Sequence, residues 1–239
     1  MTPPPFNGSG LLALLALLVH QTGLAHPLQT DDAGVLDRKQ CELETYGLRQ
    51  NDTDERSRET WLHGSCGIGG HTQLELGLAT ATHPGEGRRT GLTLSGKSQL
   101  WQAETANGDG AALSLAWQLA GARTPNGNWR HEGSELRLLS SQPLSDKLSL
   151  HLNLGHAHNV VDHAHVTTWS AALEHSPVAA LGGLAPMAEL YGDDRSPASW
   201  NLGLRLTAIP DRLVLAGAWG RQFKHNGASL MTLGFKLMF

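Results

Sequence analysis

Four histidines near the middle of the sequence form a palindrome with metal-binding potential. They lie in the stretch His156-Ala-His-Asn-Val-Val-Asp-His-Ala-His165. If a hairpin turn is centred between the two valines, His156 lies opposite His165. His158 then lies opposite His163, and all four side chains share one face. Imidazole nitrogens suit Zn²⁺ and Cu²⁺, and protonated imidazoles would pair with lipopolysaccharide phosphates, so we predict a metal or lipid contact here, with an inert polar loop as the alternative.

The two cysteines, Cys41 and Cys66, are candidates for a disulfide. They lie directly opposite one another if the segments around them form an antiparallel hairpin centred between Thr53 and Asp54. A non-hydrogen-bonded pair of opposite residues brings the two sulfurs close enough for a bridge. Disulfides are permitted in an exported chain, so we predict this bridge, with two free thiols as the alternative.

His63 and Ser65 are spaced by two, which places them on one face of a strand. A nucleophilic serine needs a base within hydrogen-bond reach and a third group that orients the base. The His-x-Ser spacing resembles outer-membrane phospholipase A, a barrel whose catalytic residues lie on its outer face. The following residues, Cys66-Gly67, depart from that family, and no orienting asparagine is evident. Lipid hydrolysis is therefore an alternative, and we predict that the protein is not an enzyme.

Charged and ionisable side chains of both signs recur on one face of the alternating segments. A Lys or Arg that faced lipid at mid-depth of a bilayer would cost ~2–4 kcal/mol, so we assign this face to the inside of a barrel. The side chains either form an ion-pair network that shapes a narrow barrel or line a pore for small solutes. The residues assigned to the lumen are Glu75, Lys97, Glu135, Arg137, His151, Glu174, Glu189, Arg205 and Lys236.

These residues are positioned by a series of strand-like segments in which leucine alternates with polar residues. In Gln73–Ala79 the leucines face away from Glu75, and in Leu148–Leu154 they face away from His151. About twelve such segments follow one another, many of about 9–11 residues, the length of a tilted membrane-crossing strand. The pattern predicts an all-β fold, a transmembrane antiparallel up-and-down β-barrel, with the four palindromic histidines outside it above the lipid. The joins are short, so we expect no loop that plugs the lumen.

The last segment, Ser229–Phe239, carries a feature of its own. Its apolar and polar residues alternate, and the chain stops on an aromatic. It resembles the C-terminal assembly signal of bacterial outer-membrane barrels, with Gly234, Leu237 and Phe239 at the characteristic positions. This resemblance implies recognition by the barrel-assembly machinery. A terminal strand of a soluble sandwich is the alternative.

The start of the sequence is typical of an exported protein. Leu11–Val19 is a continuous apolar run, too short to span a membrane as a helix, and Gly23-Leu24-Ala25 has small residues at the cleavage positions. We predict a signal peptide at 1–25, a periplasmic segment at 26–39 and an outer-membrane barrel at 40–239. The net charge of −4 gives no basic surface for nucleic acid. No cofactor is predicted.

The stretch HPLQTDDAG, followed by the strand CELETYG, resembles the opening of outer-membrane proteins grouped under a meta-pathway of phenol degradation. Together with the C-terminal strand, the resemblance covers the mature chain. It implies a passive channel or transporter surrounded by outer-membrane lipid and lipopolysaccharide. A barrel of about twelve strands lies between side-chain-filled barrels of eight and open porins of sixteen, so its solute would be small. A structural barrel without cargo is the alternative.

Overall fold

The computed structural model describes residues 28–52, 56–83, 87–103, 110–123, 127–224 and 227–239. Within them, twelve strands form one closed antiparallel barrel, each strand pairing with its neighbours in the sequence and the first with the last. The predicted barrel of about twelve strands is confirmed. The strands are β1 (Cys41–Asn51), β2 (Arg56–Gly69), β3 (Thr72–His83), β4 (Gly87–Gln102), β5 (Ala112–Arg123), β6 (Arg130–Ser145), β7 (Leu148–Asn159), β8 (Ala164–His175), β9 (Leu184–Asp193), β10 (Ser199–Ile209), β11 (Leu213–Gln222) and β12 (Ser229–Met238).

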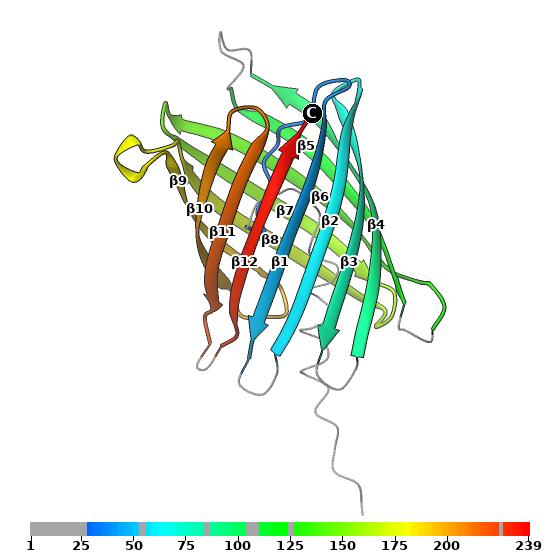
Figure 1. Ribbon diagram of the computed structural model, residues 1–239. Helices are drawn as coiled ribbons and strands as arrows, with labels where there is room; N and C mark the ends of the chain where they lie inside the picture. The colour runs from blue at the N-terminus through cyan, green and yellow to red at the C-terminus, as the bar shows by residue number, and fades with distance from the viewer. Residues whose placement is uncertain (1–27, 53–55, 84–86, 104–109, 124–126, 225–226) are drawn as a thin grey trace, which may run out of the picture.

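The barrel closes where β12 pairs with β1 (Figure 1). Beyond the last strand, Phe239 continues the pairing, because its N–H donates to the carbonyl of Cys41 at 2.9 Å and its own carbonyl accepts from the N–H of Cys41 at 2.8 Å. On β12, Leu237 points outward and Lys236 points into the barrel. The terminal aromatic therefore belongs to the seam that closes the sheet.

The two faces of the sheet are inverted relative to a soluble protein. The outward leucines are exposed, as with Leu76 (54%), Leu154 (58%) and Leu233 (58%), while polar side chains on the inner face are buried. A soluble sandwich would bury its leucines between two sheets, so this alternative is excluded. Among the described residues, no helix is long and apolar enough to cross a membrane.

The hairpin of β1 and β2 contains both cysteines. Cys41 pairs directly with Cys66, and a disulfide joins their side chains. The predicted turn centre falls on residues 53–55, which lie outside the described residues. The bridge closes a loop with a sequence separation of 25 residues. It connects β1 and β2 at the end of the barrel where β1 begins and β12 ends.

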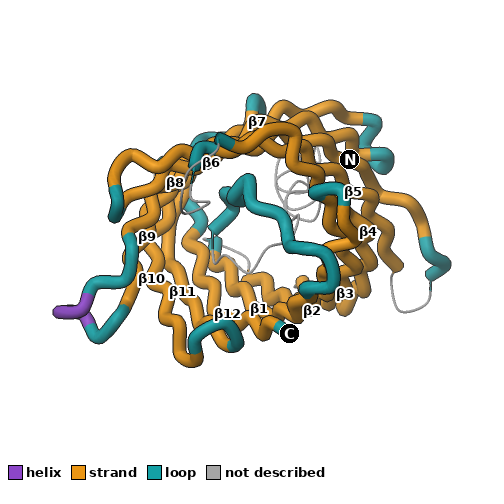
Figure 2. The backbone as a smooth tube through the Cα atoms, turned by 90° about the horizontal axis from the view of Figure 1, so that it is seen from above, coloured by secondary structure: helices purple, strands orange, loops and turns teal. Residues whose placement is uncertain are grey.

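The segment before β1 enters the barrel (Figure 2). We name residues 28–34 the plug segment. Its residues Thr30, Asp31 and Ala33 are buried against the inner wall. This location differs from the predicted periplasmic segment at 26–39. The difference has a physical reason: the segment carries no periodic pattern, and its contacts are hydrogen bonds and ion pairs with residues distant in sequence, such as Thr30 with Glu189.

Candidate pore and its plug

All nine side chains assigned to the lumen lie on the inner face of the barrel. They come from strands on every side of it, and several are almost completely buried, including Lys97 (3% exposed) and Arg137 (5%). Burial of so many charges requires partners, because an unpaired buried charge costs several kcal/mol. Some of these partners lie on other strands of the wall, and others lie on the plug segment.

One group of ion pairs joins strands of the wall to each other. Arg205 on β10 pairs with Glu174 on β8, and Nζ of Lys236 on β12 lies 3.1 Å from Oε2 of Glu42 on β1. His151 Nε2 lies 4.0 Å from the other oxygen of Glu174. These pairs connect strands that are already neighbours or next neighbours in the sheet. They hold the shape of the wall.

The wall also contains an ion pair between Arg89 and Glu132. These two residues and Glu42 were not among those predicted for the lumen. Both carboxylates occupy inward positions of their strands. The alternation alone indicates this for Glu42, two residues before Glu44 on the same face. The Arg89–Glu132 pair lies near strand ends, where the leucine pattern is too short to fix the face.

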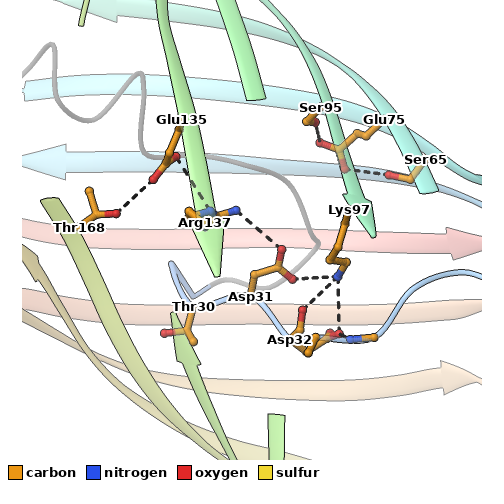
Figure 3. A network of polar contacts seen from close by, with 12 residues as sticks. Thr30, Asp31, Asp32, Ser65, Glu75, Ser95, Lys97, Glu135, Arg137 and Thr168 are labelled. Atoms are coloured by element: carbon orange, nitrogen blue, oxygen red, sulfur yellow. Dashed lines mark hydrogen bonds and ion pairs between the residues drawn. The ribbon is translucent and has the colours of Figure 1, made fainter. Parts of the chain in front are cut away.

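His63 and Ser65 lie inside the barrel, 1% and 2% exposed, and both bind the same carboxylate. Nδ1 of His63 is 3.0 Å from Oε1 of Glu75, and the Ser65 hydroxyl donates to Oε2 at 2.8 Å. Ser95 donates to Glu75 as well, at 3.1 Å (Figure 3). The serine hydroxyl is therefore directed at a carboxylate and not at the histidine. This arrangement, buried away from the outer face, does not match the lipid-hydrolase alternative.

Three rings stack next to this cluster. The ring centroids of Trp61 and His63 are 5.2 Å apart, and those of Tyr46 and His63 are 5.7 Å apart, with nearly parallel planes. The indole N–H of Trp61 donates to Glu59 at 3.1 Å. These residues of β1 and β2 point inward, on the same face as the buried Glu44 and Glu59, and this alternation is the sequence signal that could have found them. They form an aromatic strip on the wall.

The plug segment is anchored to several strands by hydrogen bonds. The Thr30 hydroxyl donates to Oε1 of Glu189 at 2.6 Å, and the backbone N–H of Thr30 binds the same oxygen. The N–H of Ala33 donates to the Ser141 hydroxyl at 2.8 Å, and Ser114 donates to the Ala33 carbonyl at 2.6 Å. The segment therefore crosses the lumen from one wall to another.

Asp31 lies at the centre of this crossing, between two cations (Figure 3). Nζ of Lys97 is 3.3 Å from its Oδ1, and Nη2 of Arg137 is 3.7 Å from its Oδ2. With its amide turned to satisfy both atoms, Asn153 accepts from the N–H of Asp31 at 2.8 Å and donates to its carbonyl at 2.9 Å. Burial raises the pKa of the Asp31 carboxyl to about 7, and Lys97 and Arg137 oppose this rise.

Two cavities flank the plug. One has a volume of about 150 Å³ and extends from Gln29 and Arg137 to the hairpin end of β9 and β10, where Tyr191 and Ser199 line it. The other has a volume of about 20 Å³ beside Asp31, enough for one water molecule, and Lys97 and Trp117 line it. Arg137 lines both cavities.

The histidine palindrome lies outside the barrel, but its predicted register is wrong. His158 pairs with His165, and β7 continues to Asn159 before a four-residue loop. The side chain of Asn159 accounts for this turn, because its oxygen accepts from the N–H groups of Val161 and Asp162 at 2.9 and 3.2 Å. His163 falls in the loop with a positive φ of 51°.

His156 and His158 both stack on His165, with ring centroids 5.4 and 4.5 Å apart. Nε2 of His156 also lies 3.3 Å from Nδ1 of His165, so these two rings interact with each other. Among the described residues, no group of three or more metal-ligating side chains is arranged to hold a metal ion. Of the predicted set, His156, His158 and His165 are brought together as stacked rings, and His163 lies apart from them in the loop.

Residues 13–239 match the model of a family described as "Uncharacterised conserved protein UCP029691". The chain belongs to this family. No curated protein matches the sequence.

Several solved structures resemble the barrel. The KdgM porin, in complex with disordered oligogalacturonate, has a TM-score of 0.61 at 10% identity, over 83% of this chain and 99% of the porin. The COG4313 outer membrane channel from Pseudomonas putida F1 has a TM-score of 0.57 at 14% identity, over 87% and 98%. The beta domain of the Bordetella autotransporter BrkA has a TM-score of 0.51 at 14% identity, over 86% and 99%. At these identities the likeness establishes the fold, that of outer-membrane barrels.

Proposed function

We propose that this protein is a passive outer-membrane channel for small amphipathic or aromatic solutes. The observation that carries this proposal is a lumen whose wall is lined with ionisable residues and whose centre is occupied by a polar segment. A barrel that served only as a membrane anchor would be expected to fill its interior with apolar side chains or fixed wall-to-wall ion pairs. Here the centre is filled by a separable piece of chain.

The exterior supports the location. Rows of exposed leucines surround the barrel, so lipid is the favoured environment, with lipopolysaccharide around the rim. Export by the predicted signal peptide at 1–25 and recognition of the Phe239 terminus by the assembly machinery complete this proposal. The fold shared with the KdgM porin and the COG4313 channel agrees with it.

The narrower relationship to the phenol-degradation group also belongs to this proposal. The motif that carries the resemblance, HPLQTDDAG, supplies the plug: its two aspartates both lie within 4 Å of Lys97, at 3.3 and 3.7 Å. That relationship implies solutes that contain a ring, and the lumen wall carries the aromatic strip of Tyr46, Trp61 and His63. No residue is proposed to catalyse a reaction.

The test is single-channel conductance of the purified barrel in a planar bilayer, together with a variant that lacks residues 28–34. We expect small, infrequent openings for the intact chain and a larger, more stable conductance for the deletion variant. Absence of conductance from both proteins, with correct folding shown by heat-modifiable migration, would refute the channel.

A structural barrel without cargo is the second candidate. It is favoured by one observation, namely that the void beside Asp31 is only about 20 Å³. The deletion variant separates the two candidates. A structural barrel stays closed or loses its fold when the plug is removed, whereas a channel opens.

A further inference from the structure

Lys97 differs from the other buried cations in the origin of its partners. Arg205 and Lys236 pair with carboxylates of the wall. Within the described residues, both ion pairs of Lys97 go to the plug segment, to Asp31 at 3.3 Å and to Asp32 at 3.7 Å. Its Nζ also donates to the carbonyl of Asp32 at 3.1 Å. The charge of Lys97 therefore depends on a piece of chain that is not part of the wall.

Arg137 shares this dependence in part. Its Nη2 lies 3.7 Å from Oδ2 of Asp31, while its Nε lies 4.0 Å from Glu135 on its own strand. The Asp31 carboxylate thus presents one oxygen to β4 and the other to β6. The side chains of Asp31, Lys97 and Arg137 are each about 5% exposed or less. A carboxylate between two buried cations is the geometry of a carboxylate-binding site.

We propose that Lys97 and Arg137 form the solute-binding site of the channel, that the site takes small carboxylates, and that Asp31 occupies it in the resting protein. This inference rests on the proposed channel function and names its solute class. If the plug segment leaves, the two cations remain buried with too little compensating charge, which favours entry of another anion. A solute carboxylate would then take the place of the Asp31 carboxylate.

The plug can be exchanged because polar contacts hold it. Among its described residues, the buried apolar side chains are Leu28 and Ala33. Apart from the ion pairs of its two aspartates, its anchors are hydrogen bonds to Ser114, Ser141, Asn153 and Glu189, which water can replace. The 150 Å³ cavity reaches Arg137, so a solute can approach the site from the hairpin end of the barrel.

The experiment is equilibrium dialysis of labelled benzoate against the full-length, detergent-solubilised protein at pH 8, where Asp31 is ionised. Asp31→Asn deprives Lys97 and Arg137 of the carboxylate that they share at pH 8, and we expect it to bind benzoate at least about tenfold more tightly than the wild type. Asp37→Asn is the matched control, because this substitution makes the same charge change at an exposed residue that lies outside the plug segment. It should bind as the wild type does. Adding Lys97→Gln to Asp31→Asn should abolish the gain, and benzyl alcohol should bind all variants alike.

A measurement on the wild type covers the case in which Asp31→Asn does not fold. Saturating benzoate should increase hydrogen exchange at residues 28–34, and benzyl alcohol should not. Equal benzoate binding by Asp31→Asn and Asp37→Asn, or unchanged exchange in the wild type with bound benzoate, would overturn the site. Conductance without benzoate dependence would refute the site and leave the channel standing, whereas benzoate binding without conductance would refute the channel alone.

Discussion

The two sides of the lumen neutralise their buried cations in different ways. On the side of β8 to β12, Arg205 and Lys236 pair with carboxylates of nearby strands. On the side of β4 and β6, Lys97 and Arg137 share a carboxylate that comes from the plug segment. Strands of a closed barrel cannot separate without loss of the ladder between them, so the first type of pair is permanent. The second type can dissociate by movement of a short segment.

Buried charges therefore have two different roles in this barrel. Wall-to-wall pairs stabilise a shape, and they would remain if the lumen were empty. Wall-to-plug pairs create a requirement for an anion at the centre of the lumen, which either the chain or a solute can satisfy. The wall and the plug should therefore respond separately to mutation, and the following tests compare them.

The largest effect is expected from the wall. Deletion of Phe239 removes two backbone hydrogen bonds to Cys41 at the seam of the barrel and the terminal aromatic of the predicted assembly signal. We expect most of the protein to be lost from the outer membrane, measured by membrane fractionation and by heat-modifiable migration. Deletion of residues 28–34 should leave the amount of protein in the outer membrane unchanged, because the twelve strands pair around the whole barrel without them. Normal levels of the Phe239 deletion would contradict the assembly role.

The sequence predicted the wall well because each strand encodes its two faces locally. The alternation of leucine with polar residues places Glu75 and His151 inside without knowledge of any contact, and the same count sets Cys41 opposite Cys66. The strand number follows from repetition of this pattern. These properties depend on residues close together in the sequence or paired across one turn.

The plug could not be predicted in this way. Thr30 and Glu189 are 159 positions apart, and their hydrogen bond depends on closure of the whole barrel. The segment has no periodic pattern that assigns a side to Asp31. The predicted register of the histidine hairpin was wrong for a local reason. The Asn159 side chain accepts hydrogen bonds from two backbone N–H groups of the loop, and the register differs from the predicted one by two residues.

An intermediate effect should distinguish the two kinds of cation directly. Lys97→Met removes one of the two cations that pair with Asp31. Because breaking a buried ion pair typically costs about 3 kcal/mol or more, the protection of residues 28–34 from hydrogen exchange should fall at least about tenfold. Arg205→Met removes a cation from the same lumen, and it should lower plug protection much less than Lys97→Met does, because the ion-pair partner of Arg205 is Glu174 of the wall. Its effect should appear as a lower temperature of heat modification. Equal loss of plug protection in both variants would show that the lumen responds as one network.

The smallest effect is expected from pH. The docked pKa of Asp31, about 7, lies above the ordinary value of 3.8, so the docked segment holds a proton more strongly than the released one. Docking is therefore more stable below pH 7, and it weakens as the pH rises through 7. The change is limited to pH values below about 7, because above it Asp31 is ionised in both states, and the anchors at Ala33 and Asn153 do not titrate. Open probability in planar bilayers should increase modestly from pH 5.5 to pH 8 in the wild type and stay constant in Asp31→Asn, whose amide carries no titrating proton. If both proteins show the same pH profile, titration of the wall, and not of the plug, controls opening.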